Sequence, residues 1–262
     1  MAVAPNPSQI FKRALEEGQR RLDQTLLELT SNAFIAGLTI VFGMAALGMV
    51  ESLVEPQFGE LAKLAGALAF GVGLVFLVVG RTELFSENFF DPVASAFQRR
   101  NAHVMWRLLR LWSITIVLNL LGGALFVAIL AVDGVLSEST AEVLTRLAEE
   151  IAQRGTSAAF VKAIVGGALV ALLSFLLAAV NSIGSRIVLA YIVGFLLALG
   201  PFDHVIVTAL HVLFGMVFGG DITAAQLAWT TMIATAGNLL GGLGLVTFTH
   251  IAQAKGAEES GW

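Results

Sequence analysis

Residues 64–90 read LAGALAFGVGLVFLVVGRTELFSENFF. The first seventeen carry no charge, as in a helix that crosses a membrane, yet Arg81, Glu83 and Glu87 follow before apolar residues resume. A crossing needs roughly 20 mostly apolar residues, so these charges arrive before the helix could comfortably finish. We therefore interpret the charged segment as an interruption within one membrane span.

The composition indicates that much of the chain faces lipid. Of 262 residues, 57% are hydrophobic and only 13% are charged, whereas soluble domains carry about 25% charged residues. The chain contains no cysteine, which excludes disulfides and thiolate metal or redox chemistry. The basic residues are few and scattered, which argues against a nucleic-acid partner. Neither a metal nor a cofactor is expected.

The apolar runs predict six spans, of which the second and the fifth are discontinuous. Residues 187–220 would extend about 51 Å as one straight helix, whereas a hydrocarbon core is only about 30 Å thick. The join near residues 201–204 is too short and too apolar for an ordinary loop, so we expect one span broken near its middle. The uncharged runs occupy residues 32–50, 64–80, 111–132, 163–185, 187–202, 205–220 and 222–254.

The basic residues predict that both termini are cytoplasmic, because short cytoplasmic segments are enriched in lysine and arginine. Those assigned to the cytoplasmic side are Lys12, Arg13, Arg20, Arg21, Arg99, Arg100, Arg107, Arg110, Arg186 and Lys255. The segments on the other side lean acidic, although they also contain Lys63, Arg146, Arg154 and Lys162.

Two stretches have the spacing of amphipathic surface helices. Residues 8–29 place apolar side chains at helical intervals among charges, and residues 140–154 do the same on the opposite side of the membrane. For both we favour a packing role over a binding role. The expected organisation is a cytoplasmic amphipathic helix (1–29), a six-span transmembrane domain (30–255) with halves at about 30–132 and 155–254 joined by an external linker (133–154), and a cytoplasmic tail (256–262).

A pentapeptide points to an internal repeat. Asn119-Leu-Leu-Gly-Gly recurs as Asn238-Leu-Leu-Gly-Gly, an offset of 119 residues. The same offset places Leu84-Phe85, in the first interruption, opposite Asp203-His204 in the second. Because each half contains three spans, the halves must have opposite orientations in the membrane, which predicts an inverted 3+3 repeat. For both asparagines we favour a role in holding helices together.

Irregular backbone at membrane depth is tolerated only where it is buried in protein or faces a wet cavity. Broken helices also direct their N-termini, which carry partial positive charge, towards the membrane centre, where they suit small anions. We expect Thr82, Ser86 or Asp91 to cap the second half of the first broken helix, and Asp203 to cap that of the second. Fixing these loops is the favoured role of Glu83, Glu87 and Asp203.

His204 is the strongest candidate for a functional residue. An ionisable side chain within a span is a functional hypothesis by default, and imidazole exchanges protons near neutral pH. The alternative is a histidine that merely bonds to the opposite loop. His211 lies seven residues later and could share the same face, but its position alone supports it less.

The sequence resembles the formate/nitrite transporter family over essentially its whole length. The resemblance rests on Glu83-Leu84-Phe85-Ser86, on Phe202-Asp203-His204 and on the Gly-Asn-Leu-Leu-Gly-Gly string from Gly237. It implies an all-α, aquaporin-like protomer that assembles as a homopentamer, with a conduction path through each subunit. The chain departs from the family at Thr208, where asparagine is common, and at Ser174, which is usually aliphatic.

The same resemblance assigns roles to residues along that path. It implies a chamber in which His204 and Thr208 meet the substrate, and loop support from Thr82, Glu83, Ser86 and Asp203. The outer constriction would consist of Phe70, Phe85 and Leu197, and the inner one of Leu74, Leu84 and Ser174. The basic residue that the family carries before the fourth span has no exact counterpart, although Arg154 and Lys162 are near. Arg81 adds a charge beside the first loop.

The predicted function is a channel or proton-linked transporter in the bacterial inner membrane for small monovalent anions or their conjugate acids. In the mechanism that the resemblance implies, an anion gains a proton at His204 and crosses the apolar gate as a neutral acid. An aquaporin-like pore for neutral solutes and a non-conducting scaffold or sensor remain as alternatives. An enzyme is not predicted, because the sequence has no recognisable nucleophile–base pair, metal cluster or phosphate loop.

Overall fold

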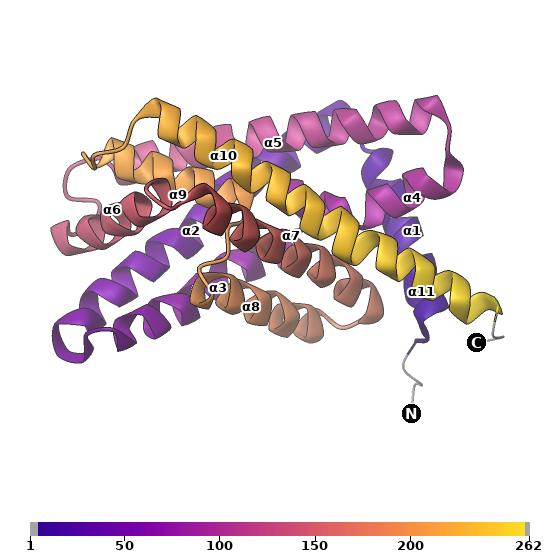
Figure 1. The fold of residues 1–262 in the computed structure, drawn as a ribbon, viewed down its shortest axis with the longest axis horizontal. Coiled ribbons are helices and arrows are strands. Elements are labelled where there is room, and N and C mark those ends of the chain that lie inside the picture. The colour runs from indigo at the N-terminus through magenta and orange to yellow at the C-terminus, as the bar shows by residue number, and fades with distance from the viewer. Residues whose placement is uncertain (1–4, 260–262) are drawn as a thin grey trace.

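The computed structural model of the chain describes residues 5–259, which form helices joined by turns and contain no strand (Figure 1). The prediction of an all-α fold is therefore confirmed. The elements are α1 (Pro7–Leu22), α2 (Leu26–Phe58), α3 (Leu61–Gly80), η1 (Phe85–Phe89), α4 (Asp91–Arg99), α5 (Ala102–Leu130), α6 (Glu138–Ala152), α7 (Thr156–Ala179), α8 (Ile183–Leu199), α9 (Val205–Val217), α10 (Ala224–Leu239), η2 (Leu240–Thr247) and α11 (Phe248–Glu259).

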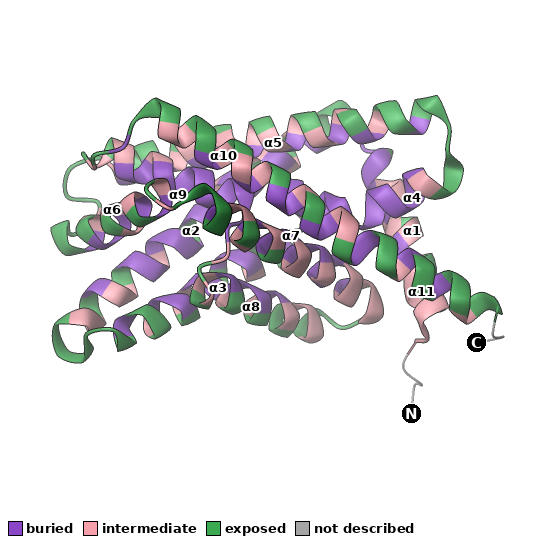
Figure 2. Cartoon of the chain, viewed as in Figure 1, coloured by how far each residue is buried: buried purple, intermediate pink, exposed green. Residues whose placement is uncertain are grey.

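Within residues 5–259, five helices are long and apolar enough to cross a membrane: α2, α3, α5, α7 and the continuous helix from α10 to α11. Their outer faces expose large apolar side chains such as Phe42, Trp106 and Leu121, while the buried residues gather between the helices (Figure 2). Such exposure suits a lipid environment. α8 and α9 are shorter apolar helices, and their joining into one interrupted crossing stays a prediction, as does the six-span count.

Helical structure stops at the two places where the sequence predicts interruptions. α3 ends at Gly80, Arg81 adopts a left-handed conformation with φ of 53°, and residues 82–84 are not helical before η1 begins. In the second half, α8 ends at Leu199 and α9 begins at Val205. The two non-helical segments, residues 81–84 and 200–204, are hereafter called the first and second breaks.

The predicted caps are wrong at both breaks. Phe90 occupies the N-cap of α4 without a side-chain bond, and Asp91 is already the first helical residue, followed by Pro92. At α9 the N-cap is His204, whose ring accepts from the Val207 backbone N–H. Thr82, Ser86 and Asp91 therefore cap no helix. Asp203 precedes the N-cap of α9 by one residue, and its carboxylate pairs with Arg154.

The terminal segments differ from the predicted boundaries. The surface helix ends at Leu22 rather than continuing to residue 29, because the Thr25 hydroxyl accepts from the Glu28 backbone N–H and starts α2 afresh. At the other end, α11 continues through residues 256–259, which the sequence analysis assigned to a tail. Residues 1–4 and 260–262 of the predicted terminal segments lie outside the described residues.

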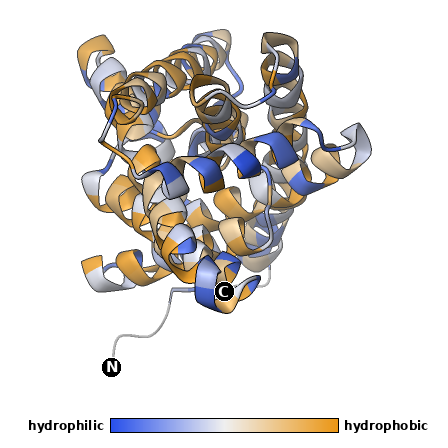
Figure 3. Cartoon of the chain, turned by 90° about the vertical axis from the view of Figure 1, so that its left-hand side faces the viewer, coloured by the Kyte–Doolittle hydropathy of each residue, from blue (hydrophilic) through white to orange (hydrophobic). Residues whose placement is uncertain are grey.

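The amphipathic helices lie at opposite ends of the bundle. α1 contacts α4 and α11 at one end, whereas α6 covers α9 and α2 at the other (Figure 1). Figure 3 looks onto the end that carries α6, where hydrophilic residues gather on turns and helix faces while the surrounding helices are mostly hydrophobic. One large apolar cluster fills the middle and includes residues of α2, α3, α7, α8 and α9.

Candidate functional site

A buried asparagine holds the first break in the middle of the bundle. The Asn119 side chain on α5 accepts a hydrogen bond from the backbone N–H of Phe85 at 2.9 Å. Its amide nitrogen donates to the carbonyl oxygens of Glu83 at 2.9 Å and Ala33 at 2.7 Å. Because backbone at this depth finds no water, one side chain supplies the partners that a helix would otherwise provide.

Asn238 on α10 forms the same set of hydrogen bonds at the second break. It accepts from the Val205 backbone N–H at 2.9 Å and donates to the carbonyls of Asp203 and Ala163, each at 2.7 Å. Each asparagine thus bonds to the carbonyl of one residue and to the N–H of the residue two positions later, which are Glu83 and Phe85 in the first half and Asp203 and Val205 in the second. This geometry agrees with the role that the sequence favours for both asparagines, which is to hold helices together.

The matching bonds correct the predicted repeat alignment by one residue. Glu83 corresponds to Asp203 because both carbonyls accept from an asparagine, and therefore Leu84 corresponds to His204. The pentapeptide offset instead paired Leu84-Phe85 with Asp203-His204. The segment from Glu83 to Asn119 is one residue longer than the segment from Asp203 to Asn238. A single offset applied to the whole repeat does not allow for that insertion.

His204 connects the two breaks. Its ring is buried, and its Nδ1 accepts from the Val207 backbone N–H at 3.5 Å. Its Nε2 forms a hydrogen bond with Ser86 Oγ, which follows the first break. With Nδ1 as an acceptor, the neutral ring carries its proton on Nε2 and donates to the Ser86 hydroxyl.

An ion pair flanks His204 on the side of α6. One guanidinium nitrogen of Arg154 donates to both carboxylate oxygens of Asp203, each at 2.7 Å. The Thr208 hydroxyl donates to Asp203 at 3.5 Å. Arg154 precedes α7, so this ion pair holds the second break against the neighbouring helix.

A second cluster of oppositely charged side chains holds the first break against α1. Glu83 accepts from Gln24 at 2.7 Å and forms ion pairs at 3.5 Å with Arg20 and Arg21. The Arg21–Glu83 contact lacks hydrogen-bond geometry and is purely ionic. Burial opposes the charged form of Arg21, but nearby carboxylates, Glu83 foremost, raise its pKa above the usual value, so it stays charged.

Two cavities approach the breaks from opposite ends. The α6 cavity, of about 60 Å³, has Phe70, Leu197, His204, Thr208 and His211 in its lining. It thus brings together the predicted central residues and two of the three predicted outer-constriction residues, with Asp203 and Arg154 at its wall.

The α1 cavity, of about 300 Å³, lies on the other side of the breaks. Thr82, Glu83 and Ser174 line it, so one predicted inner-constriction residue faces this space. The Ser174 hydroxyl donates to the Glu87 carbonyl oxygen at 3.1 Å, which attaches η1 to α7. The polar side chain at this position therefore has a bonding partner within the protein.

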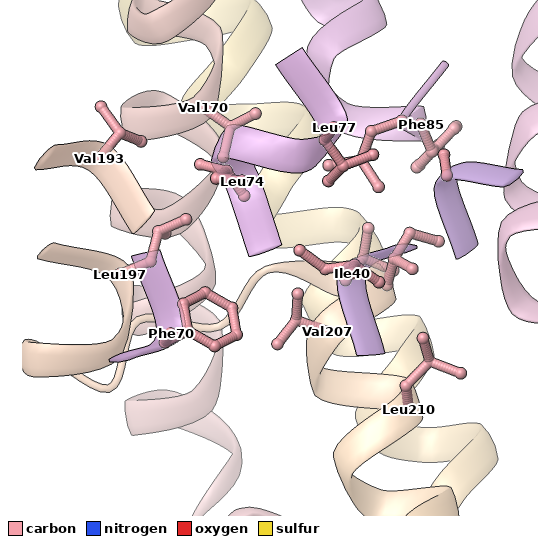
Figure 4. Packing of buried hydrophobic residues seen from close by; sticks show 14 of the residues in the cluster. Ile40, Phe70, Leu74, Leu77, Phe85, Val170, Val193, Leu197, Val207 and Leu210 are labelled. Carbon is pink, nitrogen blue, oxygen red and sulfur yellow. The ribbon is translucent and has the colours of Figure 1, made fainter. Parts of the chain in front are cut away.

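The remaining predicted constriction residues lie outside the linings of both cavities. Leu74 and Leu84 are buried and line neither cavity, and the two linings share no residue. Figure 4 shows Leu74 between Phe70 and Leu77 along α3. Phe85 lies beside Leu77 in this view, and its ring packs edge-on against Phe89 and Trp112 rather than lining either cavity. The constriction roles of these residues stay predictions.

Sequence reasoning missed two residues of this arrangement. Arg21 was counted only as a basic cytoplasmic residue, yet it shares a buried face of α1 with Ala14 and Gly18. Ala14, Gly18 and Arg21 follow one another at helical spacing, and this placement of an arginine on a face of small residues could have identified it. His211 was named but not chosen, although its ring lines the α6 cavity and its Nδ1 has no partner within residues 5–259.

Comparison with known proteins identifies the family. The sequence profile described as "Formate/nitrite transporter" matches residues 8–252, nearly the whole chain. The chain belongs to the formate/nitrite transporter family. The resemblance read from the motifs is thereby confirmed, and the chain is a multi-pass membrane protein of a transporter family.

Relatives and solved structures share this architecture. The inner membrane protein YfdC of Escherichia coli strain K12 is 24% identical over 94% of this chain and 78% of its own length. A solved FNT family ion channel superposes with a TM-score of 0.80 at 15% identity, covering 93% of this chain and 98% of that one. A pentameric formate channel with formate bound gives a TM-score of 0.72 at 19% identity, with coverage of 90% and 97%. At these identities the solved structures establish the fold alone.

Proposed function

We propose that this formate/nitrite transporter family member conducts small monovalent anions, or their conjugate acids, between the α6 cavity and the α1 cavity of each protomer. The observation that carries the proposal is the position of His204. It lines the α6 cavity together with Phe70 and Leu197, and it bonds to Ser86 of the other half of the repeat.

The role of His204 is to exchange a proton with the substrate. A bare anion in an apolar constriction is very costly, whereas a small neutral acid is not. An anion that reaches the α6 cavity meets His204 and Thr208, which both line it. The ring first takes a proton from water on the α6 side and becomes imidazolium. An N–H bond of the ring then breaks as an O–H bond forms on the anion, which leaves the ring neutral. The neutral acid passes between Phe70 and Leu197 and then between Leu74 and Leu84. Ser86 and Asp203 keep the ring and the second break in position.

We further propose a homopentamer in the bacterial inner membrane with both termini cytoplasmic. The pentamer is supported by the solved pentameric formate channel, and the membrane by the inner membrane relative. The distribution of basic residues supports the orientation, with α1 and α11 at one end of the bundle. The chain has no cysteine of its own, so Lys12→Cys and Val135→Cys can each be treated with a membrane-impermeant thiol reagent added outside. We expect labelling of Val135→Cys alone, and labelling of Lys12→Cys would contradict the proposed orientation.

The test of transport is flux into proteoliposomes at several pH values. The panel is formate, nitrite, acetate, lactate, hydrosulfide and glycerol, each measured for the wild type, for His204→Ala and for His204→Asn. His103→Ala is the matched control because His103 is exposed on α5. We expect pH-dependent anion flux that both His204 variants reduce and the control preserves. Absent anion flux, or flux unchanged by the His204 variants, contradicts the proposal.

A pore for neutral solutes is favoured by one observation. The charged side chains that line the α6 cavity, Arg154 and Asp203, neutralise each other, so that end offers no excess positive charge to concentrate anions. This alternative predicts glycerol uptake that depends neither on pH nor on His204. The same panel therefore separates the two functions, and a scaffold would conduct none of the solutes.

A further inference from the structure

Three buried carboxylates lie in the first break or shortly after it, whereas residues 5–259 contain one buried arginine, Arg21. Glu83, Glu87 and Asp91 are exposed by 1%, 3% and 3%, and Arg21 by 9%. Glu83 takes the available contacts with Gln24, Arg20 and Arg21. Glu87 and Asp91 take part in no side-chain hydrogen bond or ion pair within residues 5–259, and each has one buried oxygen without a partner.

Both unpartnered carboxylates line the α1 cavity, whose other charged groups come from α1, the first break and α8. On α1, Arg20 and Arg21 share Glu17, which they contact at 2.7 and 3.3 Å. α7 contributes the Ser174 hydroxyl, which binds the Glu87 carbonyl rather than its carboxylate. The remaining charged lining residues are Arg13 and Glu16 on α1, Arg81 in the first break and Arg186 on α8.

An ionised carboxylate buried without a partner is very costly, so each of these groups must acquire a cation or lose its charge. A metal ion is not favoured, because no group of three or more His, Asp or Glu side chains in the described part of the chain could hold one. A proton neutralises a lone carboxylate without needing further ligands. The geometry therefore favours a proton as the ligand.

We propose that Glu87 and Asp91 form a proton-binding pair in the α1 cavity that accepts the proton of the conjugate acid after it crosses the apolar barrier. This rests on the proposed function. One carboxyl group of the pair first releases its proton to water in the α1 cavity. The O–H bond of the neutral acid then breaks as a new O–H bond forms on that carboxylate, and the anion leaves towards the basic rim of Arg13, Arg81 and Arg186. The carboxyl group later releases its proton to water, so charge and atoms balance.

Proton binding is tested without transport by infrared titration of the purified protein in lipid. We expect the wild type to show a protonated-carboxyl stretch near neutral pH that loses intensity in Glu87→Gln/Asp91→Asn. Glu16→Gln, which removes a carboxylate from the exposed rim of the same cavity, should leave the band unchanged. A wild-type spectrum identical to that of the double variant overturns the proposal.

Coupling is tested by formate flux in the same preparations, recorded with internal acidification over a pH series. In the double variant we expect the midpoint of the pH profile to move by about one unit, a tenfold change in proton concentration, while Glu16→Gln keeps the wild-type profile. An unchanged midpoint overturns the acceptor role. If the wild type carries no anion at all, the proposed function fails, and the infrared titration still decides whether the pair binds a proton.

Discussion

Asn119 and Asn238, which lie on different helices, hold the two breaks with matching sets of three hydrogen bonds. Each set joins one break to a carbonyl of a neighbouring long helix, Ala33 on α2 or Ala163 on α7. The irregular backbone therefore has a defined position, and with it His204 in one half and Leu84 in the other.

Replacing either asparagine should destabilise the protein by a similar amount. Asn119→Ala and Asn238→Ala each leave one N–H and two carbonyl groups of buried backbone without this partner, and an unsatisfied group costs about 1–3 kcal/mol. We expect a loss of about 2–5 kcal/mol, measured as a lower midpoint of thermal unfolding in detergent.

The matched control for the asparagines is Thr39→Ala, which removes a hydroxyl that donates to its own helix at a half-buried position. Its unfolding midpoint should remain near that of the wild type. Equal midpoints for Thr39→Ala and the two asparagine variants would show that these hydrogen bonds do not hold the breaks.

The Arg154–Asp203 ion pair should behave as a coupled unit. The two side chains are only 13% and 5% exposed, so removal of one partner leaves a poorly solvated charge. Arg154→Gln and Asp203→Asn should each be less stable than Arg154→Gln/Asp203→Asn, with a coupling energy of about 0.5–3 kcal/mol. A double-mutant cycle of unfolding free energies measures this value, and strictly additive losses would contradict the prediction.

Glu17 should make the attachment of α1 sensitive to acid. Its pKa is lowered from 4.5 to about 2, because the hydrogen bonds and charges of Arg20 and Arg21 together outweigh the effect of burial, which raises it. Because the folded pKa lies below the unfolded one, its stabilisation is present above pH 4.5 and is lost as pH falls towards 2. Hydrogen exchange of α1 should therefore accelerate through that window.

In Glu17→Gln the exchange of α1 should already be faster at neutral pH and should show a smaller further change on acidification. Glu16→Gln is the neighbouring control, since Glu16 is exposed and makes no ion pair within residues 5–259. An identical acid response in wild type and Glu17→Gln would show that the Arg20 and Arg21 contacts do not stabilise α1.

The sequence alone predicted the parts of this fold that depend on local composition. The uncharged runs indicated the long helices, and the charges of GRTELFSEN and the Pro201–His204 segment marked where helical structure stops. The motifs around Glu83 and His204 also indicated the family before any comparison was made. These features are readable because lipid and helix geometry impose length and polarity on each segment separately.

The remaining features depend on contacts between distant segments. The helical register of Arg21 with Ala14 and Gly18 is a weak signal in the sequence, and the packing of Gly18 against the carbonyl of Asp91 is what places this face of α1, Arg21 included, against the segment after the first break. Asp203 was expected to cap α9, but Arg154, 49 residues away, binds its carboxylate. The register of the repeat likewise became clear only from the asparagine hydrogen bonds.

The apolar barrier gives the last prediction. Leu74 and Leu84 are 1% and 0% exposed and line neither cavity. Leu74→Ala and Leu84→Ala each remove a buried side chain, at a cost of about 2–5 kcal/mol in stability. If these residues are the gate, the shortened side chains join the cavities more readily and formate flux increases. Leu29→Ala is the control, because Leu29 is fully buried in a separate apolar cluster of α2, α4 and α5. It should lower stability to a similar extent without raising flux, so equal flux in Leu84→Ala and Leu29→Ala would place the barrier elsewhere.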